Sequence, residues 1–122
     1  MKNMINWFEI PVKNFDRAKK FYETIMDWKI NDGQFGGFRM GSFPMDEGKV
    51  SGAIVEGNSY EPSQVGTLVY LNCHPDLSVH LAKVEAAGGK IEMPKRQISP
   101  EIGFMAIITD TEGNRIALHS QQ

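Results

Sequence analysis

Apolar and polar positions in the first half of the chain change from the period of a strand to that of a helix and back again. Residues 5–12 are rich in β-branched and aromatic side chains and predict a strand. Asn14 then has the character of a helix N-cap, and apolar residues after it recur at the i, i+3, i+4, i+7 spacing of an amphipathic helix. This stripe consists of Ala18, Phe21, Tyr22 and Ile25, and further strands are predicted at 28–31, 35–42 and 50–56, with a turn at Asp32-Gly33.

The second half repeats this order after a polar segment at about 58–66, which we interpret as a linker. The helical stripe returns at a shift of 59 residues, as Leu77, His80, Leu81 and Val84. Strands are predicted around it at 67–73, 90–93, 104–109 and 115–119. The chain 1–122 is therefore predicted to be one domain of two βαβββ modules, at about 1–57 and 67–122. Each helix should cover one face of its sheet, and we expect the second module to close the other face of the first.

Composition narrows the class of protein. The 122 residues include 13 Lys or Arg and 15 Asp or Glu, a formal net charge of −2, and 41% are apolar. This mix is typical of a globular protein and provides no basic surface for nucleic acid or an anionic membrane. We expect a cytoplasmic protein, because no apolar run is long enough for a membrane span and the start of the chain lacks the apolar stretch of a signal peptide. The single cysteine, Cys73, excludes an internal disulfide.

Several segments carry a resemblance to a known family. They are 9–12 with Asn14 and the stripe that follows it, 84–90 (Val-Glu-Ala-Ala-Gly-Gly-Lys) and 110–119 (Asp-Thr-Glu-Gly-Asn-Arg-Ile-Ala-Leu-His). With the repeated modules, they resemble the vicinal oxygen chelate superfamily, which includes glyoxalase I, bleomycin resistance proteins and extradiol dioxygenases. Residues 66–72 and 93–95 resemble its branch described as predicted enzymes related to lactoylglutathione lyase. The resemblance implies an α+β fold in which two tandem βαβββ modules form a curved, mixed-sheet half-barrel cup with helices outside. It also implies a small-molecule ligand and a homodimer.

The resemblance further implies a divalent metal, held in the cup by His, Glu or Gln from the first and last strands of each module. These ligand positions fall on Trp7, Leu68 and Ala117, and none of the three side chains can coordinate a metal. We therefore predict no cofactor. One alternative stays open: Glu9, Glu56 and His119 together have a composition that a divalent metal accepts.

Strand alternation indicates which side chains line the cup. If Trp7 faces the cup, Glu9 faces it too, and the same argument applies to the first and last strands of the second module. Glu9 and His119 would then be the acid–base pair of any reaction. Alternatively, these residues have no functional role: Trp7 is a core residue, Glu9 a solvated strand residue and His119 a half-exposed residue near the end of the chain. The predicted ligand-binding residues are Trp7, Tyr70, Asn72 and Arg115.

Three functions are compatible with these patterns. The leading hypothesis is a small-molecule-binding protein of the superfamily, with a dimer-associated cup and without the expected metal ligands. The alternative is a lyase or isomerase related to lactoylglutathione lyase, acting on a small carbonyl compound with a divergent metal site or by metal-free acid–base chemistry. The third is an interaction module whose cup serves only dimerisation. Binding is favoured because it needs only a shaped cup, whereas the chemistry lacks its metal ligands.

Overall fold

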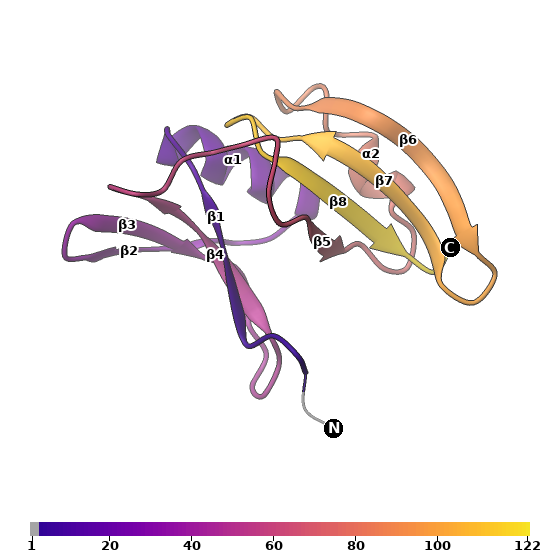
Figure 1. Cartoon of the computed structure of the whole chain (residues 1–122), viewed down its shortest axis with the longest axis horizontal. Coiled ribbons are helices and arrows are strands. Elements are labelled where there is room, and N and C mark those ends of the chain that lie inside the picture. Colours follow the sequence, from indigo (N-terminus) through magenta and orange to yellow (C-terminus); the bar gives the residue numbers. More distant parts are fainter. Residues whose placement is uncertain (1–2) are drawn as a thin grey trace.

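Two modules with the same order of elements make up the computed structural model, which describes residues 3–122 (Figure 1). The first module consists of β1 (Trp7–Pro11), α1 (Phe15–Met26), β2 (Asn31–Phe35), β3 (Phe38–Ser42) and β4 (Ser51–Glu56). The second consists of β5 (Val69–Asn72), α2 (Ser78–Leu81), β6 (Lys90–Ser99), β7 (Gly103–Thr109) and β8 (Arg115–Ser120). The predicted repeat of one strand, one helix and three strands is confirmed.

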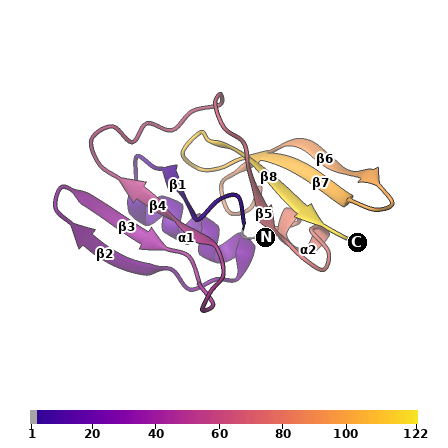
Figure 2. The ribbon, with the colours of Figure 1, turned by 60° about the horizontal axis from the view of Figure 1, so that its bottom comes forward.

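Each module contributes one four-stranded mixed sheet, with the strand orders β1-β4-β3-β2 and β5-β8-β7-β6. The first and last strands of each module are parallel, and all other neighbours are antiparallel. The two sheets are open and lie beside one another along the molecule (Figure 2). The predicted α+β class is confirmed, and β1 and β5 are edge strands of their sheets.

Helix α1 forms where the sequence predicts it. The Asn14 side chain accepts a hydrogen bond from the Arg17 backbone N–H at 3.1 Å, and so satisfies one of the free donors at the start of the helix. The helix ends at Asp27, whose φ of 56° lies in the left-handed region. Its apolar stripe is buried and consists of Phe15, Ala18, Phe21, Tyr22, Ile25 and Met26.

The helix-covered faces of both sheets share one hydrophobic core. The core joins Ile54 of the first sheet and Phe21 of α1 to Ile108 and Leu118 of the second sheet. The expectation that the second module closes the open face of the first is therefore wrong. Because α2 has only four residues, it cannot cover its sheet alone, and α1 contributes apolar side chains to both modules. The opposite face of the second sheet has its own small cluster of Met105, Ile107 and Ala117 with Leu68 and Met93.

The β2–β3 hairpin turns further along the chain than predicted. Asp32-Gly33 carries a turn signal, but both residues belong to β2, and the chain turns at Gly36, whose φ is 62°. The Asp32 carboxylate accepts hydrogen bonds from the Arg39 guanidinium on β3 at 2.7 and 3.3 Å. This cross-strand pair and the left-handed glycine favour the later turn over the one at Asp32.

The second module departs further from the prediction. Only Ser78–Leu81 of the expected helix is helical, and turns continue the chain to Gly88. The strand predicted at 90–93 continues to Ser99 as β6. Pro94 is tolerated within β6 because this is an edge strand, where a missing N–H needs no partner. Within residues 3–122, neither helix is long and apolar enough to cross a lipid bilayer.

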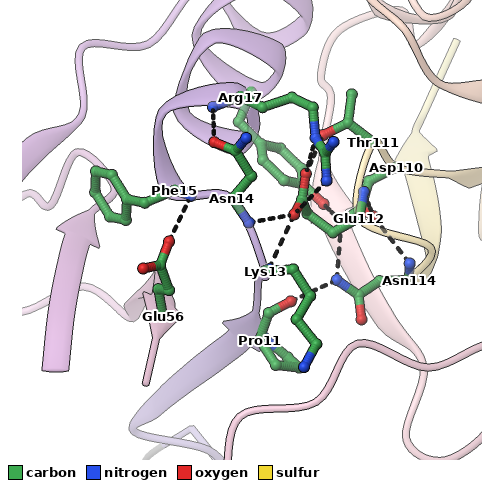
Figure 3. A network of polar contacts seen from close by, with 11 residues as sticks. Pro11, Lys13, Asn14, Phe15, Arg17, Glu56, Asp110, Thr111, Glu112 and Asn114 are labelled. Atoms are coloured by element: carbon green, nitrogen blue, oxygen red, sulfur yellow. Dashed lines mark hydrogen bonds and ion pairs between the residues drawn. The ribbon is translucent and has the colours of Figure 1, made fainter. Parts of the chain in front are cut away.

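A buried carboxylate in the β7–β8 turn joins the modules (Figure 3). The Glu112 side chain is fully buried and accepts hydrogen bonds from the backbone N–H groups of Lys13 and Asn14, at 2.9 and 2.7 Å. It also accepts two from the Arg17 guanidinium, at 2.7 and 3.1 Å. Burial opposes ionisation of Glu112, but these hydrogen bonds outweigh it and lower the pKa of the carboxyl group. The second module thus places a negative charge at the positive end of α1.

Candidate functional site

A cleft of about 610 Å³ lies between the edge strands β1 and β5, and we call it the interstrand cleft. Both tryptophans of the chain, Trp7 and Trp28, line it. Its wall is mainly apolar, and no Asp, Glu, Lys or Arg among residues 3–122 contributes to it. A pocket with few polar groups on an apolar wall is the usual form of a small-molecule site. Other lining residues include Ile5, Phe43, Val50, Leu68, Tyr70 and Asn72.

The first strands of the two modules place an aromatic ring on each side of this cleft. Trp7 of β1 is 40% exposed and Tyr70 of β5 is 50% exposed, which is high for large aromatic side chains. The alternative that Trp7 is a core residue does not hold. Two other lining rings, those of Trp28 and Phe43, lie 4.9 Å apart and pack on the main core. The cleft therefore has two exposed rings and two rings that pack on the core.

Glu9 holds Trp7 in place. One carboxylate oxygen accepts a hydrogen bond from the Trp7 indole N–H at 3.2 Å, and the other accepts one from the Tyr60 hydroxyl at 2.6 Å. The hydrogen bond to Glu9 raises the pKa of Tyr60. Tyr60 lies in the segment that the sequence suggests is a linker, so its role could not be read from the pattern. The only signal was an aromatic residue in an otherwise polar stretch.

The predicted acid–base pair is divided between two other cavities. Glu9 lines a cavity of about 200 Å³ together with Arg115. His119 lines a cavity of about 550 Å³, which we call the histidine pocket, together with Tyr70, Asn72, His74, Ile98 and Ile102. Of the predicted ligand-binding residues, Trp7, Tyr70 and Asn72 share the interstrand cleft, whereas Arg115 lies outside it.

The residues at the family's metal positions do not fit a metal ion. Trp7 and Leu68 line the interstrand cleft without a donor that binds metals. Ala117 is fully buried in the small cluster on the second sheet. The alternative set is not brought together either, because Glu56 accepts a hydrogen bond from the Phe15 backbone N–H at 2.7 Å, at the start of α1. Within residues 3–122, no three or more His, Cys, Asp or Glu side chains are close enough to hold a metal ion.

Comparison with known proteins places this fold and site in a family. The model of the Glyoxalase/Bleomycin resistance protein/Dioxygenase superfamily matches residues 4–118, and the chain belongs to this superfamily. A glyoxylase-like domain-containing protein of Didymella fabae is 30% identical over 127 residues, which cover 97% of this chain and 94% of that protein.

Solved structures of the superfamily share the fold. A glyoxylase/bleomycin resistance protein/dioxygenase domain from Frankia sp. EAN1pec aligns over 100% of both chains with a TM-score of 0.75 and 14% identity. TnmS3, an antibiotic binding protein from Streptomyces sp. CB03234, aligns over 98% of this chain and 97% of its own, with a TM-score of 0.70 and 20% identity. The fosfomycin resistance protein FosX of Listeria monocytogenes aligns over 100% of this chain and 93% of its own, with a TM-score of 0.68 and 15% identity. At these identities the likeness establishes the fold.

Proposed function

We propose that this protein binds a small, uncharged and largely aromatic molecule in the interstrand cleft, as a homodimer and without metal chelation. The observation that carries the proposal is a cleft of about 610 Å³ with two tryptophans and Tyr70 in its wall and with no charged side chain among the described residues. Aromatic rings prefer offset or edge-on contact with other rings, so a flat ligand gains most from this wall.

The polarity of the cleft supports an uncharged ligand. Its polar groups are few, among them the side chains of Ser51, Thr67 and Asn72. These can orient a ligand by hydrogen bonds, but they cannot neutralise a charge. A buried charge without a partner is costly, so a charged analogue of the same shape should bind less well.

The titles of the related structures support a small-molecule-binding function, but they do not identify the ligand of this chain. TnmS3 is titled an antibiotic binding protein and FosX a fosfomycin resistance protein. We infer a related task for this chain, in which the ligand is held and not converted. The absence of donors at Trp7, Leu68 and Ala117 supports this inference, because the superfamily's metal chemistry has no site at these positions.

Exposed apolar side chains on the sheets support a homodimer. Phe35 and Phe38 on the first sheet are 59% and 38% exposed, and Ile102 beside the second is 52% exposed. A second copy could cover such residues in a closed, symmetric dimer. Light scattering after size exclusion should give twice the chain mass of 13.7 kDa, and a monomer at micromolar concentration would contradict this part of the proposal.

Tryptophan fluorescence tests the ligand class directly, because both tryptophans line the cleft. Three probes share one tricyclic ring and differ in charge: 9-anthracenemethanol, 9-anthracenecarboxylate and 9-(aminomethyl)anthracene. We expect saturable quenching by the neutral probe, and binding of the two charged probes weaker by about tenfold or more. Equal affinity for all three, or no saturable quenching, would contradict the proposal.

A matched pair of variants locates the binding. Tyr70→Ala removes a ring from the cleft and should weaken binding of the neutral probe by about two- to tenfold, since one aromatic contact is worth about 0.5–1.5 kcal/mol. Val79→Ala removes an exposed apolar side chain on α2 that does not line the cleft, and it should leave the affinity unchanged. Circular dichroism of both variants checks that the fold is intact.

A further inference from the structure

Two of the three histidines of the chain lie side by side in the histidine pocket. The ring centroids of His74 and His119 are 5.4 Å apart, and the ring planes are inclined at 62°. The sheet brings them together, because Asn72 of β5 is paired with His119 of β8, and His74 follows two residues later. The Asn72 side chain fixes the His74 backbone by accepting a hydrogen bond from its N–H at 3.0 Å.

The tautomer of His119 is set by its surroundings. Its Nε2 lies 2.7 Å from the carbonyl oxygen of Ile102, which can only accept, so Nε2 carries the hydrogen. The neutral ring then has its lone pair on Nδ1. Histidines that bind metals in proteins have this arrangement, in which the second ring nitrogen donates to a carbonyl or carboxylate group.

The spacing of the two rings allows both to bind one ion. A bound metal lies about 2.0–2.1 Å from an imidazole nitrogen, and therefore roughly 3.2 Å from the ring centroid. If two imidazoles bind one ion, their centroids are about 4.5 Å apart at a right angle and about 6.4 Å apart in a line. The observed 5.4 Å lies between these limits.

We propose that His74 and His119 form a two-histidine site for a divalent transition-metal ion. Imidazole ligands suit Cu²⁺, Ni²⁺ and Zn²⁺, and the general order of affinities makes Cu²⁺ the tightest of the three. The pocket of about 550 Å³ leaves room for water or an added ligand to complete the coordination. This site is distinct from the family's metal positions at Trp7, Leu68 and Ala117, and it does not depend on ligand binding in the interstrand cleft.

Binding of Cu²⁺ alone tests the proposal. Calorimetry at neutral pH should show one Cu²⁺ per wild-type chain, and the electron paramagnetic resonance spectrum should show splitting from two nitrogen ligands. His74→Asn and His119→Asn should each weaken binding by about tenfold or more, because a second ligand on the same chain acts at high effective concentration. The spectrum of either variant should show one nitrogen fewer. Ni²⁺ and Zn²⁺ should bind more weakly than Cu²⁺.

His80→Asn is the matched control. The His80 Nδ1 lies 2.9 Å from the Ile25 carbonyl oxygen, and the residue does not line the histidine pocket. This variant should bind Cu²⁺ as the wild type does. Equal Cu²⁺ binding by the wild type and the double variant His74→Asn/His119→Asn would overturn the site, as would an equal loss in His80→Asn. His74 is exposed, so its substitution keeps the test informative even if the His119 variant is unstable.

Titration of the double variant with 9-anthracenemethanol separates the two proposals, because the cleft should bind the probe normally without the histidines.

Discussion

Replacing Glu112 tests the contact that joins the two modules. Its carboxylate is fully buried and accepts two backbone hydrogen bonds, two from Arg17 and one from the Thr111 hydroxyl. A hydrogen bond to a charged group contributes about 1.5–3 kcal/mol. When Glu112 is replaced, the half-exposed Arg17 can form hydrogen bonds with water instead, so the loss of its two bonds costs less than this. Glu112→Gln keeps one oxygen for the backbone donors and sets an amide N–H₂ against the guanidinium. We expect it to lower the free energy of unfolding by about 2 kcal/mol, and Glu112→Ala to lower it by about 3–4 kcal/mol.

The pH dependence of this loss identifies the charge as its cause. The pKa of Glu112 is lower in the folded protein, so the carboxylate's contribution is present above the unfolded pKa of about 4.3. It is lost as the pH falls through the folded pKa, where the wild-type side chain becomes neutral like Gln. Urea unfolding followed by circular dichroism should therefore show a large difference between wild type and Glu112→Gln at neutral pH and a small one in strong acid.

Glu61→Gln is the control for this experiment. Glu61 forms an ion pair with Lys13 at 2.6 Å, but both side chains are mostly exposed, so its loss should cost less than about 1 kcal/mol. Protein concentration must be held constant, because a dimer's stability depends on it. A Glu112→Gln loss below about 0.5 kcal/mol, or one that is the same at neutral and acidic pH, would refute the reasoning.

Further predictions concern buried groups and metal content. Tyr22→Phe removes a buried hydroxyl that donates to Asp110 at 2.6 Å, and urea unfolding should show a loss of about 1–3 kcal/mol. Burial raises the pKa of Cys73 to about 12, so a disulfide reagent should modify this thiol only after denaturation, and rapid modification of the native protein would contradict the buried site. Elemental analysis of the purified double variant His74→Asn/His119→Asn should find far less than one metal ion per chain. A stoichiometric metal in that variant would show that the chain holds a metal outside the histidine pocket.

Periodicity predicted the architecture because the strongest apolar patterns coincide with the elements that bury the most apolar surface. The stripe of Ala18, Phe21, Tyr22 and Ile25 is buried as expected, since its N-cap and its spacing are local properties. The apolar stripe of the second module predicted its helix less well. Leu77 and Val84 are buried, but only Ser78–Leu81 is helical, and unlike α1 this helix has no side-chain cap at its start.

The candidate site was predicted in part. Trp7, Tyr70 and Asn72 line one cleft, but alternation along the strands does not explain it, because the neighbouring Phe8 and Leu71 line the cleft too and Glu9 does not. Trp28 was missed as a cleft residue because the sequence predicts a strand at 28–31, whereas residues 28–30 are irregular and β2 begins only at Asn31. Tyr60 was missed because its partner Glu9 is 51 residues away in the chain.

The sequence by itself determined the two βαβββ modules, the family and the absence of metal-binding side chains at the family's positions, because these depend on local order and residue type. Only the tertiary structure decided that the helix-covered faces meet in one core and that β1 and β5 form an aromatic cleft. It also decided that Glu112 reaches the start of α1 and that the His74 and His119 rings are neighbours. Such contacts join residues far apart in the chain, and the packing of whole modules fixes their geometry.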